Sequence, residues 1–425
     1  MARHLTDILV VGGGKAGSQL AASLRDEGFD GTISIVGEEP LHPYDRPPLS
    51  KEYLGAGEVA DLLLRTEHFY HDSAIDIETA TRIGTLDTAS HVAKRTDGSE
   101  ISYGELVLAT GARPRRLRIP GADSAGVSPL RSIEDADRLK AILTARSDLV
   151  VIGGGFVGLE VAATAAISYG CKVTVMEALP RLLSRTALPD TAAYVERFHK
   201  SLGVEVLLGA QAAEILSKDG HVTAVVTGEG QVIPADGIVY GIGVEPRVEL
   251  AESAGIEVAN GVLVDSTLHS SADGVWAIGD CCAFPSVHFG GVVRLESVQN
   301  ATDQARHLAR ELFSGVRSAY TAVPWFWSDQ GELHLQSVGL TGQNDSTVVV
   351  GDAASGSFTV LAFNEGRLIG GDSVNAPSDH LALKRLLGSD TASGLTSTMA
   401  GGPGFTLKDF ARQARLARET LSPGV

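Results

Sequence analysis

The chain has 425 residues, of which 44% are hydrophobic and 49 are glycine, and its formal net charge is −17 with a pI near 5.1. This length exceeds what one hydrophobic core serves, so we expect two or three domains, and the glycine content suits an α/β enzyme with tight turns. The acidic balance argues against nucleic acid or an anionic membrane as the main partner.

The N-terminal residues predict a nucleotide-binding unit. An apolar strand, Asp7–Val11, leads into a GxGxxG motif at residues 12–17, and a second strand, Thr32–Val36, reaches Glu38. In such a unit the glycines let the backbone approach a pyrophosphate, the following helix offers N–H groups, and the acid accepts a hydrogen bond from a ribose. Because a strand begins by about residue 7, we expect no signal sequence.

A proline-rich segment, Pro40–Tyr53, follows Glu38. Its four prolines predict an ordered, irregular loop that then enters a short helix. Loops of this length without regular structure are usually functional. Further on, Arg113–Gly121 predicts a basic crossover between domains, whose arginines we expect to face solvent.

The nucleotide-binding pattern recurs 141 residues later, counted from Gly12 to Gly153. Its parts are the strand Leu149–Ile152, a GxGxxG motif at residues 153–158, an Ala-rich helix Leu159–Ser168, the strand Lys172–Met176 and Glu177. Two such units imply two dinucleotides, and the natural reason to hold both is to pass electrons between them.

Two other interpretations of the second unit are open to the sequence. The 22 residues Leu149–Gly170 are apolar enough to suggest a membrane span, but Glu160 lies mid-run and three glycines fall where a strand would stop. A glycine-rich turn without a ligand is the other interpretation, and the repetition of the whole pattern argues against it.

From Pro324 the composition changes, and we expect a separate antiparallel sheet. The predicted features are, in order, the aromatic cluster Trp325–Trp327, three alternating runs at Leu333–Val338, Ser346–Val350 and Phe358–Phe363, a helix over Asp379–Leu387, a Gly/Pro/Ser-rich stretch to Gly404 and a final basic helix.

The three cysteines are Cys171, Cys281 and Cys282. They form no CxxC or metal-ligand spacing, and the adjacent pair is poorly placed to form a disulfide with itself. We therefore expect a reduced, cytoplasmic, soluble protein without a metal site.

Seven motifs together carry a family resemblance: GGGKAG, GEEPLHPYDRPPLSK, LATGARPR, GGGFVGLE, AIGD, ESVQNA and PWFWSDQ. The chain resembles, over nearly its whole length, the FAD-dependent, NADH-linked ferredoxin reductases of bacterial oxygenase systems, the family of putidaredoxin reductase and of biphenyl dioxygenase reductase components. The resemblance implies an α/β fold with two Rossmann-like domains, arranged as in glutathione reductase, and a C-terminal α+β domain. The implied domains are an FAD-binding domain at residues 1–113 and 241–320, an NAD-binding domain at 114–240 and an interface domain at 321–425.

The resemblance implies that the first unit binds FAD. The implied contacts are Gly12, Gly14 and Ala16 at the pyrophosphate, Glu38 at the adenosine ribose, Arg46 and Lys51 at the pyrophosphate and flavin edge, Ile83 at the adenine, Thr110 and Gly111 beneath the cofactor, Arg131 from the linker side, Asp280 at the ribityl chain, Val298 at the pyrimidine end and Trp327 at the far side of the flavin.

The second unit is then implied to bind NADH. The implied contacts are Gly153, Gly155, Phe156, Val157 and Gly158 at the pyrophosphate, Glu177 at the ribose, Arg185 nearby, and Gly241 in the strand Gly237–Gly243 beneath the nicotinamide. A carboxylate at residue 177 accepts from a 2′-OH and repels a 2′-phosphate, so we expect NADH to be preferred over NADPH.

The implied reaction is hydride transfer from NADH to FAD, followed by single-electron transfer to a [2Fe–2S] ferredoxin that feeds a cytochrome P450 or Rieske-type oxygenase. The implied catalytic residues are Lys51, which stabilises charge on reduced flavin, and Glu160, which holds it. Lys15, a cation at the start of a helix, departs from the usual pattern and its role stays open. Arg306 and Arg310, four residues apart on one helix face, form with Arg65 either a ferredoxin-docking surface or a solvated face.

Several alternatives remain at this point. A flavin disulfide reductase needs a CxxxxC beside the flavin, and an NADH oxidase of this fold needs a cysteine soon after Glu38; residues 38–60 contain none. A rubredoxin reductase is compatible with the motifs, and so is a flavoprotein related to apoptosis-inducing factor that acts through binding and conformation. Monomer and homodimer are both open.

Overall fold

The computed structural model describes residues 4–55, 57–145, 147–389 and 394–421. By its internal contacts the chain forms two compact units. The first comprises Met1–Arg46, Glu58–Arg113 and Val244–Ala322, and the second comprises Pro47–Gly57, Pro114–Gly243 and Val323–Val425. Among the residues described, none of the helices is both long and apolar enough to cross a membrane.

The first unit is built on a sheet with the strand order β3–β2–β1–β6–β5–β4, and β19 pairs with β6 as well. The pairs β1–β2, β1–β6, β2–β3 and β6–β19 are parallel, while β4, β5 and β6 are antiparallel. The strands are β1 (His4–Val11), β2 (Ile33–Val36), β3 (Ile75–Glu78), β4 (Ile83–Asp87), β5 (Val92–Arg95), β6 (Glu100–Leu108) and β19 (Val275–Ala277).

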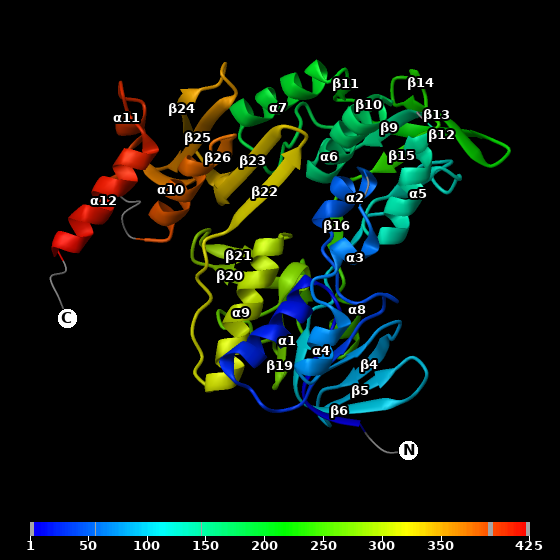
Figure 1. Cartoon of the computed structure of the whole chain (residues 1–425), viewed down its shortest axis with the longest axis vertical. Helices are drawn as coiled ribbons and strands as arrows, with labels where there is room; N and C mark the ends of the chain where they lie inside the picture. The colour runs from blue at the N-terminus through cyan, green and yellow to red at the C-terminus, as the bar shows by residue number, and fades with distance from the viewer. Residues whose placement is uncertain (1–3, 56, 146, 390–393, 422–425) are drawn as a thin grey trace. The chain divides into compact units, whose positions relative to one another are not determined.

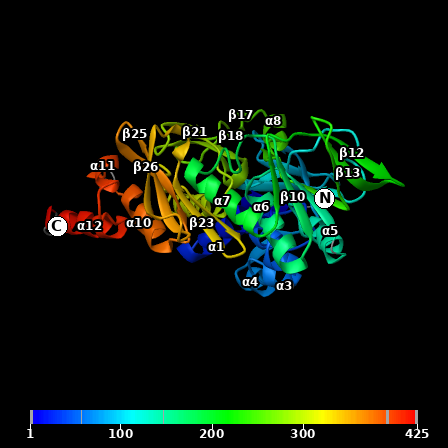
Figure 2. The same ribbon diagram turned by 90° about the horizontal axis from the view of Figure 1, so that it is seen from above.

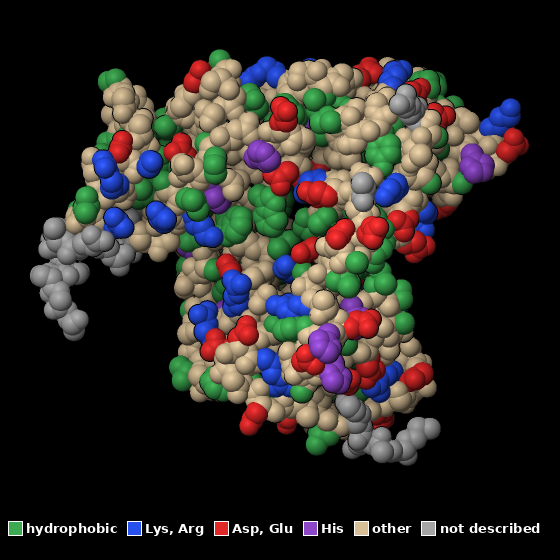
Figure 3. Space-filling view, viewed as in Figure 1, with side chains coloured by type: hydrophobic (Ala, Val, Ile, Leu, Met, Phe, Trp, Pro, Cys, Tyr) green, Lys and Arg blue, Asp and Glu red, His purple; other side chains and the backbone are tan. Residues whose placement is uncertain are grey.

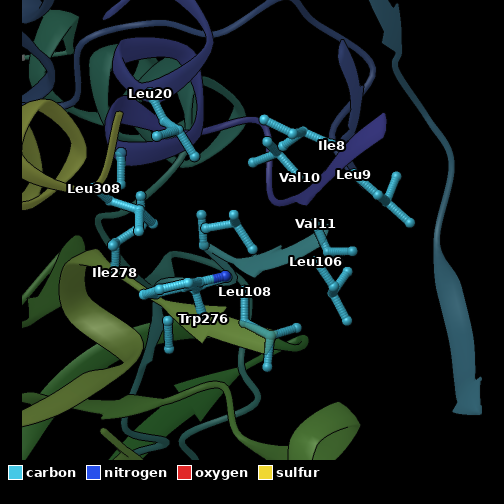
Figure 4. Packing of buried hydrophobic residues seen from close by; sticks show 14 of the residues in the cluster. Ile8, Leu9, Val10, Val11, Leu20, Leu106, Leu108, Trp276, Ile278 and Leu308 are labelled. Carbon is cyan, nitrogen blue, oxygen red and sulfur yellow. The ribbon is translucent and has the colours of Figure 1, made fainter. Parts of the chain in front are cut away.

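Two helices, α1 (Lys15–Glu27) and α9 (Val298–Ser314), lie side by side in this unit (Figure 1). Figure 4 shows Leu20 of α1 and Leu308 of α9 beside side chains of β1 and β6. All four residues Ile8–Val11 at the end of β1 are buried, as a strand covered on both faces requires. Fully burying one such side chain contributes about 1.5–3 kcal/mol, so this apolar layer fixes the edge from which the GxGxxG turn starts.

Smaller elements complete the first unit. They are α3 (Val59–Leu62), α4 (Glu67–Asp72), β7 (Ala112–Pro114), β16 (Val244–Pro246), α8 (Glu249–Ser253), β17 (Val258–Ala259), β18 (Gly261–Leu263), η3 (Gly279–Cys281), β20 (Cys282–Ser286) and β21 (Gly291–Val293). Asp280 lies in the 3-10 turn η3, which one residue separates from the end of β19.

The second unit contains a parallel sheet with the order β11–β10–β9–β15–β8. Its strands and helices are β8 (Val127–Pro129), α5 (Ile133–Thr144), β9 (Asp148–Ile152), α6 (Phe156–Thr164), β10 (Lys172–Glu177), α7 (Pro189–Ser201), β11 (Glu205–Leu208) and β15 (Gly237–Tyr240). A separate three-stranded antiparallel sheet consists of β12 (Ala212–Lys218), β13 (His221–Thr227) and β14 (Val232–Pro234). The helix predicted from Leu159 starts three residues earlier, at Phe156, and ends in a π-helical turn, Ala165–Tyr169.

The proline-rich segment contributes to the second unit as well. It forms a 3-10 helix, η1 (Pro47–Ser50), and a short helix, α2 (Glu52–Gly55). Thr164 Oγ1 at the end of α6 donates to Ser50 O at 2.9 Å, and the Tyr169 hydroxyl donates to Leu54 O. Lys51, although early in the sequence, is thereby held by the second nucleotide-binding unit.

The C-terminal residues form the antiparallel sheet β22–β23–β26–β25–β24. The elements are β22 (Trp325–Gln330), β23 (Leu333–Gly339), η4 (Thr341–Gln343), β24 (Ser346–Asp352), β25 (Ser357–Asn364), β26 (Arg367–Val374), α10 (Pro377–Leu387), α11 (Ser397–Ala400) and α12 (Leu407–Leu421). Part of the Gly/Pro/Ser-rich stretch, residues 390–393, lies outside the described residues. Figure 2 shows α7 beside β23, and the Tyr194 ring of α7 packs on Phe358 of β25 with 5.3 Å between centroids.

The predicted fold class is confirmed: α/β, with a mixed sheet in the first unit, a parallel sheet in the second and a small C-terminal antiparallel sheet. The strands β22 and β26 were not predicted, because aromatic residues and glycines obscure their alternation. We keep the three-domain division as a proposal, since the parallel and C-terminal sheets belong to one compact unit.

Candidate functional site

The first GxGxxG turn brings backbone so close to backbone that only glycine fits. A Cβ at Gly12 would lie 2.1 Å from Ala109 O, and one at Gly17 would lie 2.2 Å from Gly12 O. Gly14 is the N-cap of α1, and the first turn, Lys15–Gly17, contains no acid. The helix N-terminus therefore presents backbone N–H groups and its positive dipole end without a capping side chain, as an anion site requires.

The second turn repeats this geometry. A Cβ at Gly153 would lie 2.5 Å from Gly241 O, and one at Gly158 would lie 2.3 Å from Gly153 O. Gly155 is the N-cap of α6, whose first turn also contains no acid. Gly241 thus occupies in the second sheet the place that Ala109 occupies in the first, which is a spatial reason to include it in the site.

The two acids after the second strands have different partners. Glu177 accepts hydrogen bonds from the Gly154 and Leu179 N–H groups at 2.7 and 2.8 Å, so its carboxylate is fixed against the glycine turn. Glu38 is exposed and forms ion pairs with Arg247 at 2.5 Å and Arg82 at 3.5 Å. Both lie at the ends of their strands, where a ribose acceptor is needed.

Other predicted FAD contacts gather near the first turn. A Cβ at Gly279 would lie 3.0 Å from Ala16 Cβ, so the turn that carries Asp280 lies against the start of α1. Arg46 forms an ion pair with Glu39, and its guanidinium lies 5.0 Å from the Tyr44 ring centre. Burial alone would lower the pKa of Arg46, but the charges of Glu39, Tyr44 and Asp280 raise it, so the cation persists.

The remaining predicted residues of the first unit are placed by backbone contacts. Thr110 Oγ1 donates to Arg247 O at 2.7 Å, and Gly111 O accepts from Arg247 N at 2.9 Å, which closes the chain after β6. Ile83 is buried at the start of β4, and Val298 is the first residue of α9. The open question of Lys15 has a structural answer, because its Nζ pairs with Asp45 Oδ1 at 3.0 Å.

The predicted contacts in the second unit are more scattered. Phe156 stacks on Phe326 of β22 with 4.4 Å between ring centroids, and Trp327 lies next to Trp325 at 5.5 Å. Val157 is 43% exposed, and Arg185 is exposed near Gly243. Arg131, whose N–H donates to Asp135 at 3.0 Å, belongs to this unit and lies between β8 and α5.

A buried ion pair joins the two residues predicted to be catalytic. Lys51 Nζ lies 3.2 Å from Glu160 Oε1, and their side chains are 13% and 7% exposed. Ser50 and Ser328 donate to the same carboxylate at 2.5 and 2.7 Å. Burial raises the pKa of Glu160, while the Lys51 charge and the serine hydroxyls act in the opposite direction.

The cysteines are all buried, and none of the three forms a disulfide. Burial raises the pKa of Cys281 and of Cys282, so neither thiol is activated as a nucleophile. Within the described residues, no group of three His, Cys, Asp or Glu side chains could hold a metal ion.

Two known family models match this chain. Residues 6–305 match the family model described as pyridine nucleotide-disulphide oxidoreductase. The chain belongs to this family. A second model, described as reductase C-terminal, matches residues 325–411 of this oxidoreductase.

The chain is also similar to individual named proteins over most of its length. The oxidoreductase is 43% identical to rhodocoxin reductase from Rhodococcus erythropolis over 402 residues, which is 94% of this chain and 93% of the relative. It is 40% identical to a rubredoxin-NAD(+) reductase from Pseudomonas putida over 378 residues, covering 88% of this chain and 97% of the relative. The crystal structure of the ferredoxin reductase for the CYP199A2 system from Rhodopseudomonas palustris superposes with a TM-score of 0.92 at 40% identity, covering 96% of this chain and 100% of that one. The predicted resemblance to ferredoxin reductases is confirmed.

Both cofactors implied by the family, FAD and a nicotinamide dinucleotide, fit the residues present. Each glycine turn leaves the backbone accessible. Among the residues that the structure describes, none has an atom within 4 Å of a Cβ built at Gly14, and Gly241 O, at 4.0 Å, is the one atom that near a Cβ built at Gly155. Each turn also has a carboxylate at the end of the following strand, Glu38 or Glu177.

Sequence reasoning missed several polar neighbours of the site. Ser50 and Ser328 contact Glu160, and Arg247 contacts Glu38. Ser328 belongs to the PWFWSDQ motif, but the aromatic residues of that motif obscure the alternation of Ser328 with Gln330 along the strand. Arg247 carried no signal, since it lies more than 200 positions from its partner.

Proposed function

We propose that this oxidoreductase passes electrons from NADH through FAD to a [2Fe–2S] ferredoxin, which supplies a cytochrome P450 or a Rieske-type oxygenase. The observation that carries the proposal is the duplicated turn: Gly12 and Gly17 in the first unit and Gly153 and Gly158 in the second approach backbone oxygens in the same way. Family membership agrees with two dinucleotides in one chain.

When bound, NADH would supply a hydride, which is two electrons and a proton, and FAD would pass the two electrons on one at a time and release the proton. The protein residues bind and orient these groups. The α1 and α6 N-termini would hold the two pyrophosphates, Asp280 and Val298 would orient the flavin, and Lys51 would supply a positive charge held in place by Glu160. No acid–base triad is required for this chemistry.

Selectivity for NADH is proposed to rest on Glu177. Its carboxylate is fixed by two backbone N–H groups and keeps acceptor capacity for a ribose 2′-OH. A 2′-phosphate would place like charges together, and Arg185 alone does not replace the carboxylate. We expect kcat/KM for NADH to exceed that for NADPH by at least tenfold, a difference of about 1.4 kcal/mol.

Rubredoxin is the competing electron acceptor. The 40% identity with a rubredoxin-NAD(+) reductase matches the identity with the ferredoxin reductase structure, so identity does not choose between the carriers. We favour ferredoxin because the motifs of the chain as a whole resemble reductases of oxygenase systems.

The test is a reduction assay with cytochrome c as final acceptor. Purified protein is expected to be yellow, to be bleached by NADH without a carrier, and to reduce cytochrome c rapidly only when a [2Fe–2S] ferredoxin is added. Faster turnover with rubredoxin would identify the other carrier. A colourless protein would contradict the proposal outright. Slow turnover with every carrier beside a long-lived NADH complex would also contradict it, and would favour a flavoprotein related to apoptosis-inducing factor that acts through binding and conformation.

A matched pair of variants assigns the roles at the ion pair. Lys51→Met is expected to slow NADH-dependent bleaching by about 10- to 100-fold, because about 1.4–2.7 kcal/mol of charge stabilisation is lost. Lys140→Met removes another lysine of the same unit, one whose ammonium group contacts the Tyr53 ring and carbonyl, and it serves as the control. Unchanged bleaching in Lys51→Met would remove Lys51 from the mechanism.

A further inference from the structure

A line of buried polar side chains leads away from Glu160. Ser328 Oγ donates to Glu160 Oε1 at 2.7 Å, Gln330 Nε2 donates to Ser328 Oγ at 3.1 Å, and His199 Nε2 lies 2.8 Å from Gln330 Oε1. Ser328, Gln330 and His199 are each 0% exposed. The line connects α6, β22 and α7 within the second unit.

The chemistry of the groups gives this line one direction. An ionised carboxylate only accepts, so the Ser328 hydroxyl must donate to it, and the serine oxygen is then free to accept from the Gln330 amide. The Gln330 carbonyl in turn accepts, so His199 donates from Nε2 and is neutral with a bare Nδ1. Among the described residues Nδ1 has no partner, as this tautomer allows and a protonated ring would not.

Among the described residues, Lys51 is the charged group whose electrostatic effect on Glu160 opposes that of burial. From η1 and α2 Glu160 faces Lys51 and Ser50, while Glu52 is exposed. On β22 the intervening residue Asp329 points to the opposite face and bonds His334 at 2.7 Å. On α7 the charged residues next to His199 in the sequence are Glu196, Arg197 and Lys200. Glu196 and Lys200 pair with each other at 2.6 Å, and the Arg197 guanidinium lies over the Tyr194 ring.

We propose that Ser328, Gln330 and His199 are positioning residues, a one-way chain of donors that keeps Glu160 ionised and directed at Lys51. Aligned donors in a dry interior polarise one another, so each link strengthens the bond that ends on the carboxylate. Loss of any link makes the ionised form less favourable and loosens the ion pair. The proposal rests on the proposed function of Lys51 and Glu160. It gives Ser328 and Gln330 of the PWFWSDQ motif a role in positioning Glu160.

The first measurement is independent of turnover. The infrared band of a protonated carboxyl, assigned to Glu160 by its absence in Glu160→Gln, is followed against pH in FAD-loaded protein without NADH. We expect its midpoint to rise by about one to two pH units in Ser328→Ala, since this variant removes a hydrogen bond to the charged form of the carboxyl group. In Gln330→Leu and His199→Phe the midpoint is expected to rise by roughly half a pH unit, because these residues lie one and two hydrogen bonds further from Glu160 than Ser328 does.

Conservative and control variants sharpen the measurement. Ser328→Thr keeps the hydroxyl and His199→Gln keeps an N–H donor, so both are expected to return the midpoint toward wild type. His380→Phe removes another buried histidine of the same unit, one that contacts Trp325 and not Glu160, and is expected to leave the midpoint unchanged. The ¹⁵N shifts of His199 are expected to show the neutral Nε2–H form.

The outcomes separate this inference from the proposed function. Midpoints in Gln330→Leu and His199→Phe that equal wild type would end the chain at Ser328 and overturn the role of both residues. A wild-type protein that NADH fails to bleach would contradict the proposed function, yet the infrared midpoints would still decide whether the donor chain exists. The pH profile of bleaching is expected to shift with the infrared midpoint in the same order of variants.

Discussion

At the scale of single residues, the main feature is the buried ion pair between Lys51 and Glu160. Glu160 lies on the first turns of α6 and Lys51 lies between η1 and α2, so an ion pair joins two segments far apart in the sequence. Desolvation makes such a pair costly unless both partners are present and hydrogen bonded, and Ser50 and Ser328 complete the bonding of the carboxylate.

Removing one partner is therefore expected to cost more than removing both. Lys51→Met leaves a buried, unpaired carboxylate and is expected to lower the free energy of unfolding by about 3 kcal/mol. The double variant Lys51→Met/Glu160→Gln is expected to recover most of that loss, because a neutral amide can still bond the two serines. Urea unfolding at pH 7 measures both, and a double variant no more stable than Lys51→Met would contradict this account.

A second residue-scale prediction concerns pH. Burial, and secondarily the Lys384 charge, lower the pKa of His380 to about 4 from 6.5. Between pH 6.5 and 4 the unfolded chain therefore binds a proton at His380 that the folded chain does not bind. The contribution of this group to the free energy of unfolding is fully present above pH 6.5 and is lost as the pH falls toward 4. The difference in unfolding free energy between wild type and His380→Phe is expected to change by about 3 kcal/mol across this range. A pH-independent difference would show that His380 takes up its proton over the same pH range in the folded and the unfolded chain.

At the scale of elements, the protein uses one device twice. Strand, glycine turn and helix place a bare helix N-terminus at the carboxyl edge of a parallel sheet in each unit. The third glycine allows each helix to pack on its own strand: a Cβ at Gly17 would also lie 3.0 Å from Val10 Cγ1, and one at Gly158 would lie 3.0 Å from Val151 Cγ1. The equivalence makes the two positions matched controls for each other.

We expect Gly17→Ala and Gly158→Ala to separate the two cofactors. Each added methyl must displace backbone, at about 1–3 kcal/mol of strain, and lifts its helix from its strand. Gly17→Ala is expected to purify with little FAD, while Gly158→Ala should keep FAD and show a KM for NADH raised at least tenfold. Visible absorbance and steady-state kinetics measure these effects. Equal FAD loss in both variants would mean that the strain spreads beyond its own unit.

At the scale of the whole molecule, charge is unevenly distributed in an acidic protein. The net charge is −17, yet Lys and Arg side chains gather over α9 and over α10 and α12 (Figure 3). Arg306 and Arg310 are both exposed on α9, whereas Arg65 is committed to Ser18 at 3.0 Å and to the Phe69 ring. We therefore assign proposed ferredoxin docking to the α9 arginines and not to Arg65.

Ionic strength tests this assignment. Raising salt from 0.01 to 0.1 M shortens the screening length from about 30 to about 10 Å, so ferredoxin-dependent cytochrome c reduction is expected to slow while NADH bleaching stays constant. Arg306→Ala/Arg310→Ala is expected to flatten the salt dependence, and Arg118→Ala, an exposed arginine of the second unit, is expected to retain it. Identical salt curves for both variants would exclude α9 from docking.

The sequence by itself determined the two glycine turns, their acids, the α/β class and the family, because these depend on local spacing that the chain carries with it. Residues such as Gly12, Gly17 and Glu177 could be named for this reason. Only the tertiary structure decided which side chains meet: it joined Lys51 to Glu160, brought Ser328 and His199 into the same buried line, gave Lys15 its partner Asp45, and placed Gly241 against Gly153. These contacts join residues that are 30 to 168 positions apart, and their energy comes from desolvation and packing that exist only once the sheets have formed.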